Sequence, residues 1–206
     1  MTQSTIFCDF DGPIVDVSER YYATYRQGLE LLQAKDPDAE SGEKSRPLSK
    51  AQFWTFKQNR IPDRQIAHWS GLEAGQIDDF LDLVGHLVNH PSLLDHDRLQ
   101  PQAYAGLDML HQCGVRVVLV TLRPPAQVRQ FLAQHDLDWA ISDLYGMPTA
   151  QAAYQNQANH KIERLRTAIA AQREQGYSLS QAWMIGDTEA DIMAGQALGL
   201  DTVAVT

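Results

Sequence analysis

A short apolar segment near the start of the chain constrains the fold most strongly. Residues 4–9 are mostly apolar or β-branched and run into Asp9-Phe10-Asp11-Gly12. A run of this kind, followed at once by acids and a glycine, is typical of a buried strand that leads into a loop. Because side chains two apart on extended backbone share a side, Asp9 and Asp11 are expected to face the same way at the carboxyl end of this strand.

The rest of the chain alternates between strand and helix patterns. Further buried strands are expected over 115–121, 139–142, 182–186 and 202–205. Helical periodicity is present over 16–34, 53–57, 64–69, 77–88, 102–113, 126–135 and 160–175, with a polar loop over 36–47. The pattern predicts an α/β fold, a Rossmann-like parallel sheet core with helices on both faces, formed by residues 1–16 and 101–206. Residues 17–100 are expected to form a helical insert.

The charge of the chain disfavours two classes of partner. Its 17 basic and 26 acidic residues give a net charge of −9, which would repel nucleic acid and anionic membranes. The stretch from Lys44 to Arg64 is an exception, with six basic residues and the single acid Asp63. It is read either as a solvated helix face or as a rim that attracts phosphate.

Other features predict a soluble, cytoplasmic protein. No apolar run approaches the roughly 18 residues that span a bilayer, and the first residues lack the pattern of a signal peptide. Cys8 and Cys113 lie in or beside apolar segments and are expected to be reduced core residues, not a disulfide or a metal pair. The histidines have no zinc-like spacing, and no metal is assigned to them.

Polar side chains follow the predicted strands or begin the predicted helices. In chain order they are Asp9 with Asp11, Thr121, Lys161, and Asp187 with Asp191. Because parallel strands end at one edge of a sheet, these groups are expected to gather there. Taken singly, each acid could instead be a strand-end, turn or helix-capping residue, as is expected of Asp16.

The gathered groups have the chemistry that phosphoryl transfer requires. Asp9 can attack phosphorus, while Asp11 can protonate the leaving alcohol and later take a proton from water. The hydroxyl of Thr121 and the next backbone amide, that of Leu122, can hold phosphate oxygens, and Lys161 supplies positive charge. Arg123 could bind a substrate anion or form a salt bridge at the start of a helix.

Clustered carboxylates repel one another unless a cation joins them. Mg²⁺ prefers one or two carboxylates together with water and phosphate oxygens. Asp9 and Asp187 are the candidate ligands, and Asp191, four residues further on, could instead face solvent. The pattern therefore favours a magnesium site at this edge of the sheet.

These residues resemble the motifs of the haloacid dehalogenase-like superfamily of phosphohydrolases. The first motif resembles Asp9-Phe10-Asp11-Gly12-Pro13-Ile14-Val15-Asp16, the second Thr121, the third Lys161, and the fourth Gly186-Asp187-Thr188-Glu189-Ala190-Asp191. The family often has threonine where Pro13 stands, and a small or amide residue where Leu122 stands. The order and spacing of the motifs agree across the whole core.

The resemblance implies a role for each matched residue. Asp9 would be the nucleophile, Asp11 the general acid and base with its backbone carbonyl on the metal, and Asp187 a further metal ligand. Asp191 would support the metal through water. The insert of residues 17–100 would be the family's helical cap, and substrate would be closed between cap and core.

The expected activity is Mg²⁺-dependent hydrolysis of a small phosphorylated metabolite of the phosphoglycolate or sugar phosphate class. A phosphomutase would use the same chemistry, and a phospho-aspartate switch would share the acids, threonine and lysine. The order of the motifs argues against a signalling receiver. Pro13 and Leu122 are the only support for a non-catalytic binding protein, and dehalogenation is disfavoured because it does not need the second acid, Asp11.

Overall fold

The chain folds into two compact units. A computed structural model describes residues 4–35, 46–148 and 158–205. One unit consists of residues 1–16 and 98–206, and the other of residues 17–97.

The first unit is built on a five-stranded sheet in the order β5-β4-β1-β6-β7, in which every pair of neighbours is parallel. The central strand, β1, has four buried residues and pairs with β4 on one side and β6 on the other. Burial on both faces explains why its sequence is continuously apolar or β-branched. The strands are β1 (Thr5–Cys8), β4 (Arg116–Val120), β5 (Asp143–Tyr145), β6 (Ala182–Gly186) and β7 (Asp201–Ala204).

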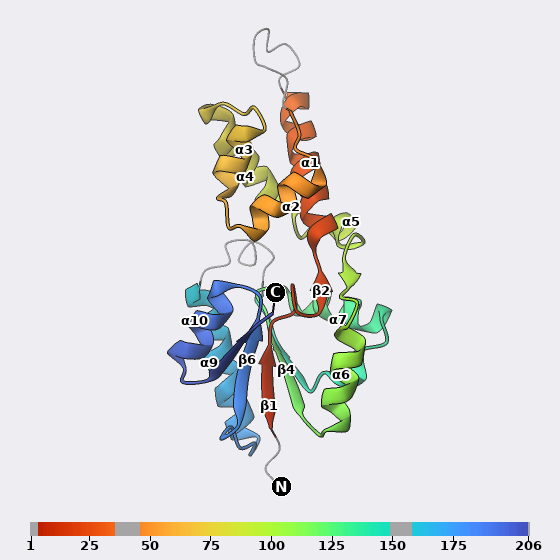
Figure 1. The fold of residues 1–206 in the computed structure, drawn as a ribbon, viewed down its shortest axis with the longest axis vertical. Helices are drawn as coiled ribbons and strands as arrows, with labels where there is room; N and C mark the ends of the chain where they lie inside the picture. The colour runs from red at the N-terminus through yellow and green to blue at the C-terminus, as the bar shows by residue number, and fades with distance from the viewer. Residues whose placement is uncertain (1–3, 36–45, 149–157, 206) are drawn as a thin grey trace. The chain divides into compact units, whose positions relative to one another are not determined.

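Helices cover both faces of this sheet, as Figure 1 shows. On one face lie α9 (Ala158–Glu174) and α10 (Glu189–Ala197), and on the other α6 (Ala103–Gln112) and α7 (Pro125–Gln134). The core beneath α9 and α10 consists of Phe7, Val118, Val120, Leu165, Ala168, Ile169, Ala182, Met184 and Ala194. The predicted α/β core is confirmed.

The second unit is entirely helical over its described residues. Its core is aromatic: Tyr25 stacks on Phe53 with ring centroids 4.8 Å apart and meets Phe80 edge-on at 6.2 Å. A capping box at Ser49 and Gln52 fixes the start of α2. The helices are α1 (Ser18–Lys35), α2 (Lys50–Gln58), α3 (Asp63–Trp69), α4 (Ala74–Leu87) and α5 (Pro91–Leu94).

Acidic side chains within this unit neutralise part of its basic stretch. Lys57 lies 2.7 Å from Asp63, and Lys50 and Arg64 form ion pairs with Glu19 and Asp78. These pairs fit a solvated helix face better than a rim that attracts phosphate. Lys44, at the start of the stretch, lies outside the described residues.

The structure differs from the sequence prediction between residues 138 and 145. A strand was expected over 139–142, but a 3-10 helix, η1, occupies Asp138–Ala140, and the strand β5 begins at Asp143. The indole of Trp139 donates to the carbonyl of Asp136 at 2.7 Å, which holds its backbone in a turn. The predicted strand was therefore wrong at Trp139, because a local hydrogen bond overrides its β propensity.

Two short strands were missed by the sequence analysis. β2 (Val15–Asp16) pairs antiparallel with β3 (Arg98–Leu99), where the chain leaves and re-enters the first unit. Asp16, expected to cap a helix, lies in β2. Two-residue strands have no periodicity that a sequence pattern could reveal.

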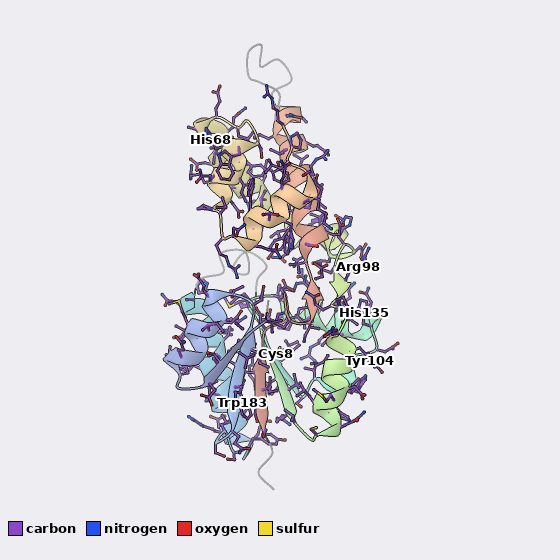
Figure 2. All side chains as sticks on the ribbon, in the orientation of Figure 1. Cys8, His68, Arg98, Tyr104, His135 and Trp183 are labelled. Carbon is purple, nitrogen blue, oxygen red and sulfur yellow. The ribbon has the colours of Figure 1, made fainter. Side chains whose placement is uncertain are left out.

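The two cysteines differ in environment. Cys8 is free and buried in β1 (Figure 2), whereas Cys113 is free and exposed at the end of α6, so the expectation of a core residue was wrong for Cys113. Burial and the neighbouring Asp9 raise the pKa of the Cys8 thiol. Among the helices of the described ranges, none combines the length and apolar character needed to span a bilayer.

Candidate active site

Three of the predicted site residues follow three adjacent strands. Asp9 comes directly after β1, Thr121 after β4 and Asp187 after β6. The backbone ladder continues one residue past two of these strands: the amide of Asp9 donates to Ile185 at 2.8 Å and that of Thr121 to Tyr145 at 2.9 Å. The sheet therefore fixes the backbone from which these side chains extend.

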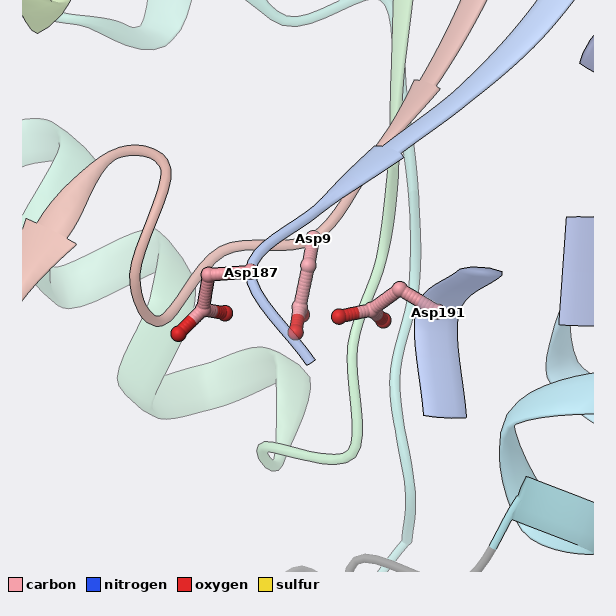
Figure 3. Close-up of side chains that lie close together, drawn as sticks. All are labelled: Asp9, Asp187 and Asp191. Atoms are coloured by element: carbon pink, nitrogen blue, oxygen red, sulfur yellow. The ribbon is translucent and has the colours of Figure 1, made fainter. Parts of the chain in front are cut away.

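Three carboxylates converge at this edge of the sheet. One oxygen each of Asp9, Asp187 and Asp191 lies within 4.8 Å of the others. Figure 3 shows the Asp9 side chain between those of Asp187 and Asp191. Asp191 comes from α10 and is fully buried, so the cluster joins two strand ends to a helix.

Lys161, on α9, neutralises part of this cluster. Its Nζ lies 2.7 Å from Oδ1 of Asp9 and 2.7 Å from Oδ1 of Asp191, and its side chain is 2% exposed. The three predicted residues therefore form one buried ion network. A buried ammonium without carboxylate partners would be strongly destabilising.

The second oxygen of Asp191 is also engaged. Oδ2 accepts hydrogen bonds from the backbone amide of Thr188 at 3.1 Å and from its hydroxyl at 2.7 Å, completing a capping box at the start of α10. This structural role of Thr188 was not predicted from the sequence. The spacing Thr-x-x-Asp before a helix is the signal that could have revealed it.

The electrostatics of the cluster favour a bound cation. Burial and the neighbouring Asp191 raise the pKa of Asp9 to about 8, against the opposing effect of Lys161. Burial disfavours the charged form of Lys161, but the carboxylates of Asp9 and Asp191 outweigh it and raise the pKa of the ammonium. A single positive charge, that of Lys161, thus compensates more than one carboxylate. Three oxygen donors within 4.8 Å fit a hard divalent cation, which would counter the repulsion among them.

Gly12 allows the loop after β1 to approach the cluster. Its φ is +96°, and a Cβ at this position would lie 2.2 Å from Cγ of Asp187. Only glycine fits both the backbone conformation and the space. Its carbonyl accepts a hydrogen bond at 2.9 Å from the side chain of Gln100, a supporting residue that the sequence analysis missed.

The remaining predicted residues form a second group. The hydroxyl of Thr121 accepts a hydrogen bond from the amide of Arg123 at 3.1 Å, so its own hydrogen is left to donate. The guanidinium of Arg123 reaches Asp11, with Nε 3.3 Å from Oδ1. Leu122, between them, is 6% exposed. Asp11 is thereby linked to the loop that follows β4.

Comparison with known families identifies the fold. The model of the haloacid dehalogenase-like hydrolase family matches residues 6–205. The chain belongs to this family. The resemblance inferred from the sequence motifs is confirmed.

Two curated relatives of this chain are phosphoglycolate phosphatases. That of Aliivibrio fischeri is 30% identical over 124 residues, which cover 59% of this chain and 47% of the relative. That of Vibrio cholerae is 29% identical over 129 residues, which cover 63% and 50%. The matched segment thus spans about half the length of these relatives.

Solved structures of the family share the fold. A haloacid dehalogenase-like family hydrolase from Streptococcus pneumoniae has a TM-score of 0.65 and 18% identity, and the match covers 99% of this chain and 85% of that one. A superfamily hydrolase of subfamily IA from Geobacter sulfurreducens has a TM-score of 0.63 at 18% identity, with coverage of 98% and 86%. At this identity the likeness concerns the fold alone.

Proposed function

We propose that this chain is a phosphatase that hydrolyses a small phosphate monoester through a phospho-aspartate intermediate on Asp9. The observation that carries the proposal is the position of the Asp9 carboxylate. It lies at the carboxyl end of the central strand, 2.7 Å from the ammonium of Lys161 and beside Asp187. A nucleophile next to positive charge at this edge of an α/β sheet suits phosphoryl transfer.

The proposed reaction has two steps. An oxygen of Asp9 attacks phosphorus, the bond to the leaving oxygen breaks, and that oxygen takes a proton from Asp11. Water then attacks phosphorus, gives a proton to the Asp11 carboxylate, and releases inorganic phosphate and the free Asp9 carboxylate. Asp11 therefore ends the cycle protonated, as it began.

Other residues are proposed to hold the phosphoryl group. The Thr121 hydroxyl and the amide of Leu122 would donate to its oxygens, and Lys161 would neutralise its charge. Mg²⁺ held by Asp9, Asp187 and the backbone carbonyl of Asp11 would supply further charge stabilisation. Because Oδ1 of Asp191 forms an ion pair with Lys161 and Oδ2 accepts a hydrogen bond from Thr188, we assign Asp191 an indirect role at the metal.

The substrate is proposed to be a small phosphorylated metabolite. The names of the two curated relatives favour phosphoglycolate or a compound like it. Sugar phosphates form the second class to test. The part that residues 17–100 play as a substrate-selecting cap stays a prediction.

The test is phosphate release from p-nitrophenyl phosphate and from a panel that includes 2-phosphoglycolate and hexose phosphates. Wild type, Asp9→Asn and wild type with chelator are compared at equal protein concentration. We expect release by wild type with Mg²⁺ only, and background rates in both controls. Trapping of ³²P on wild type but not on Asp9→Asn would support the covalent intermediate.

Two outcomes would overturn the proposal. Release by Asp9→Asn at the wild-type rate would exclude Asp9 as the nucleophile. Formation of an isomeric phosphate ester without net phosphate release would indicate a phosphomutase instead.

A further inference from the structure

We infer that Arg123 is a positioning residue for Asp11, whose carboxyl group it holds by an ion pair in the orientation that proton transfer requires. The inference rests on the proposed function, because it assigns Asp11 the proton transfers of that reaction. Of the two roles that the sequence suggested for Arg123, it develops the salt bridge and differs from the contact with a substrate anion.

The side chain of Arg123 is buried. It is 3% exposed, whereas that of Asp11 is 24% exposed. A guanidinium is rarely buried without a partner, and here Nε lies 3.3 Å from Oδ1 of Asp11. The more exposed partner, Asp11, is therefore the one placed to meet solvent and substrate.

The guanidinium of Arg123 also packs over an aromatic ring. Its central carbon lies 5.3 Å from the ring centroid of Phe10, a residue with no exposed surface. That ring is held edge-on by Phe131 at 5.5 Å. Arg123 thus contacts the two consecutive residues Phe10 and Asp11, which leaves its side chain little freedom to turn away.

The backbone of Arg123 is also restrained. Its amide donates to Thr121, and its carbonyl accepts from the amide of Met147 at 3.2 Å. A Cβ on Gly146 would lie 2.4 Å from that carbonyl, so the close approach depends on glycine. The residue that holds Asp11 is therefore tied to Thr121, the proposed phosphate anchor.

The ion pair restrains the carboxyl group of Asp11. Nε of Arg123 lies 3.3 Å from Oδ1, so the buried guanidinium attracts the carboxyl group toward the loop that follows β4. Without Arg123 the carboxyl group could rotate, and proton transfer to the leaving oxygen would become less effective.

The test uses Arg123→Met, which removes the charge and keeps a long side chain, and Arg123→Lys, which keeps the charge without Nε. Exposed Arg129 lies on α7, which begins two residues after Arg123, and Arg129→Met is the matched control. The measured quantity is kcat/KM for p-nitrophenyl phosphate, ethyl phosphate and 2-phosphoglycolate. This ratio reports the steps up to departure of the leaving group, where only a poor leaving group needs a proton.

We expect kcat/KM of Arg123→Met to fall about 10²-fold for the two alkyl phosphates, the range in which general acid catalysis operates, and much less for the aryl phosphate. Arg123→Lys should show the same pattern in weaker form, and Arg129→Met should match wild type. Equal losses with all three substrates would overturn the inference. So would a loss confined to 2-phosphoglycolate and expressed in KM, because that result would make Arg123 a contact for the substrate carboxylate.

A crystal structure of Arg123→Met provides a readout that needs no turnover. We expect the Asp11 carboxyl group in a different rotamer or in several rotamers, with Asp9 and Lys161 unchanged. An unmoved Asp11 would overturn the inference even if the variant were slow. If wild type hydrolysed none of the esters, the proposed function would fail, and this structure alone would decide whether Arg123 positions Asp11.

Discussion

At the scale of single residues, the site depends on a few buried charges. Lys161 lies between Asp9 and Asp191, 2.7 Å from each. Removing one member of such a network leaves the others buried without compensation, which costs more than the pairing itself contributes. Lys161 therefore matters for stability as well as for the proposed reaction.

The first prediction concerns Lys161→Met. We expect the free energy of unfolding without Mg²⁺ to fall by about 3 to 5 kcal/mol, because two buried carboxylates lose their cation. Urea unfolding in the presence of a chelator measures the loss. The control is Arg166→Met, which removes a solvent-exposed ion pair. A Lys161→Met protein as stable as wild type would contradict the ion network.

The second prediction concerns Gly12. Gly12→Ala places a Cβ 2.2 Å from Asp187 at a φ of +96°, whereas Gly199→Ala has a φ of +72° and no atom within 4 Å. Both variants should lose about 1 to 2 kcal/mol of unfolding free energy from the left-handed backbone alone. Gly12→Ala should lose more unfolding free energy than Gly199→Ala, and it should also lose the phosphatase activity. Denaturant unfolding measures both variants, and equal losses would argue against the close approach of Gly12 to Asp187.

At the scale of elements, buried polar networks join segments that are distant in the sequence. In the helical unit Arg20 of α1 bonds Asp97 at 2.8 Å, Asn89 at 2.9 Å and the carbonyl of Val88 at 3.1 Å. Arg20 and Asp97 are each 1% exposed in their side chains. Arg20 therefore links the start of the helical unit, in α1, to its last residues.

The third prediction is that Arg20→Met weakens the helical unit by about 3 to 5 kcal/mol, because the buried carboxylate of Asp97 loses the positive charge of Arg20. Hydrogen exchange of the amides in α1 and α4 should accelerate, while β1 and β4 keep their protection. Arg26→Met, which removes an exposed pair with Glu30, should change stability by less than about 0.5 kcal/mol. Equal losses of stability in Arg20→Met and Arg26→Met would contradict a stabilising role of the buried Arg20 network.

In the α/β unit a second network joins β5 to α9. Asp143 accepts hydrogen bonds from the Tyr145 hydroxyl at 2.7 Å, the Leu144 amide at 2.9 Å and Gln172 at 3.0 Å. Partial burial acts to raise the pKa of Asp143, but these hydrogen bonds outweigh it and the pKa is lowered. The ionised form is therefore favoured in the folded protein.

The fourth prediction follows from the sign of that shift. A lowered folded pKa means that Asp143 stabilises the protein above its unfolded pKa of about 3.9, and that this contribution is lost as the pH falls through the folded value. Asp143→Asn should lower stability at neutral pH and flatten its decline below about pH 4. Unfolding curves across this range test the prediction, with exposed Asp138→Asn as control.

At the scale of the whole molecule, the acid cluster should couple folding to metal binding. A ligand that binds only the folded state stabilises it by about 2.7 kcal/mol at a hundred times its Kd. Asp9 is far along the chain from Asp187 and Asp191, so the three carboxylates meet only in the folded chain.

The fifth prediction is that Mg²⁺ raises the Tm of wild type in a concentration-dependent manner and that Asp187→Asn abolishes the rise. Thermal unfolding with Mg²⁺ or chelator measures it. Asp82→Asn, at an exposed position of α4, should respond as wild type does. A Tm that Mg²⁺ leaves unchanged would contradict a magnesium site at the cluster.

The sequence by itself determined the α/β core and the order of its site residues. Strands buried on both faces are continuously apolar, so β1, β4 and β6 could be recognised, and polar residues that follow them must lie at one edge. The short strands β2 and β3 and the 3-10 helix at Trp139 could not be predicted, because local hydrogen bonds and pairing across the chain decide them. The site roles assigned to Asp9, Asp11 and Asp187 stay predictions.

Only the tertiary structure decided which site residues touch. Nothing in the spacing of Lys161 and Asp191 indicates that they share an ion pair, and nothing in the spacing of Arg123 and Asp11 does so either. Side-chain contacts between distant segments depend on how helices and loops pack on the sheet, and a linear pattern does not encode these distances. The physical reason is that periodicity reports which face of an element is buried, whereas pairing depends on the position of the partner.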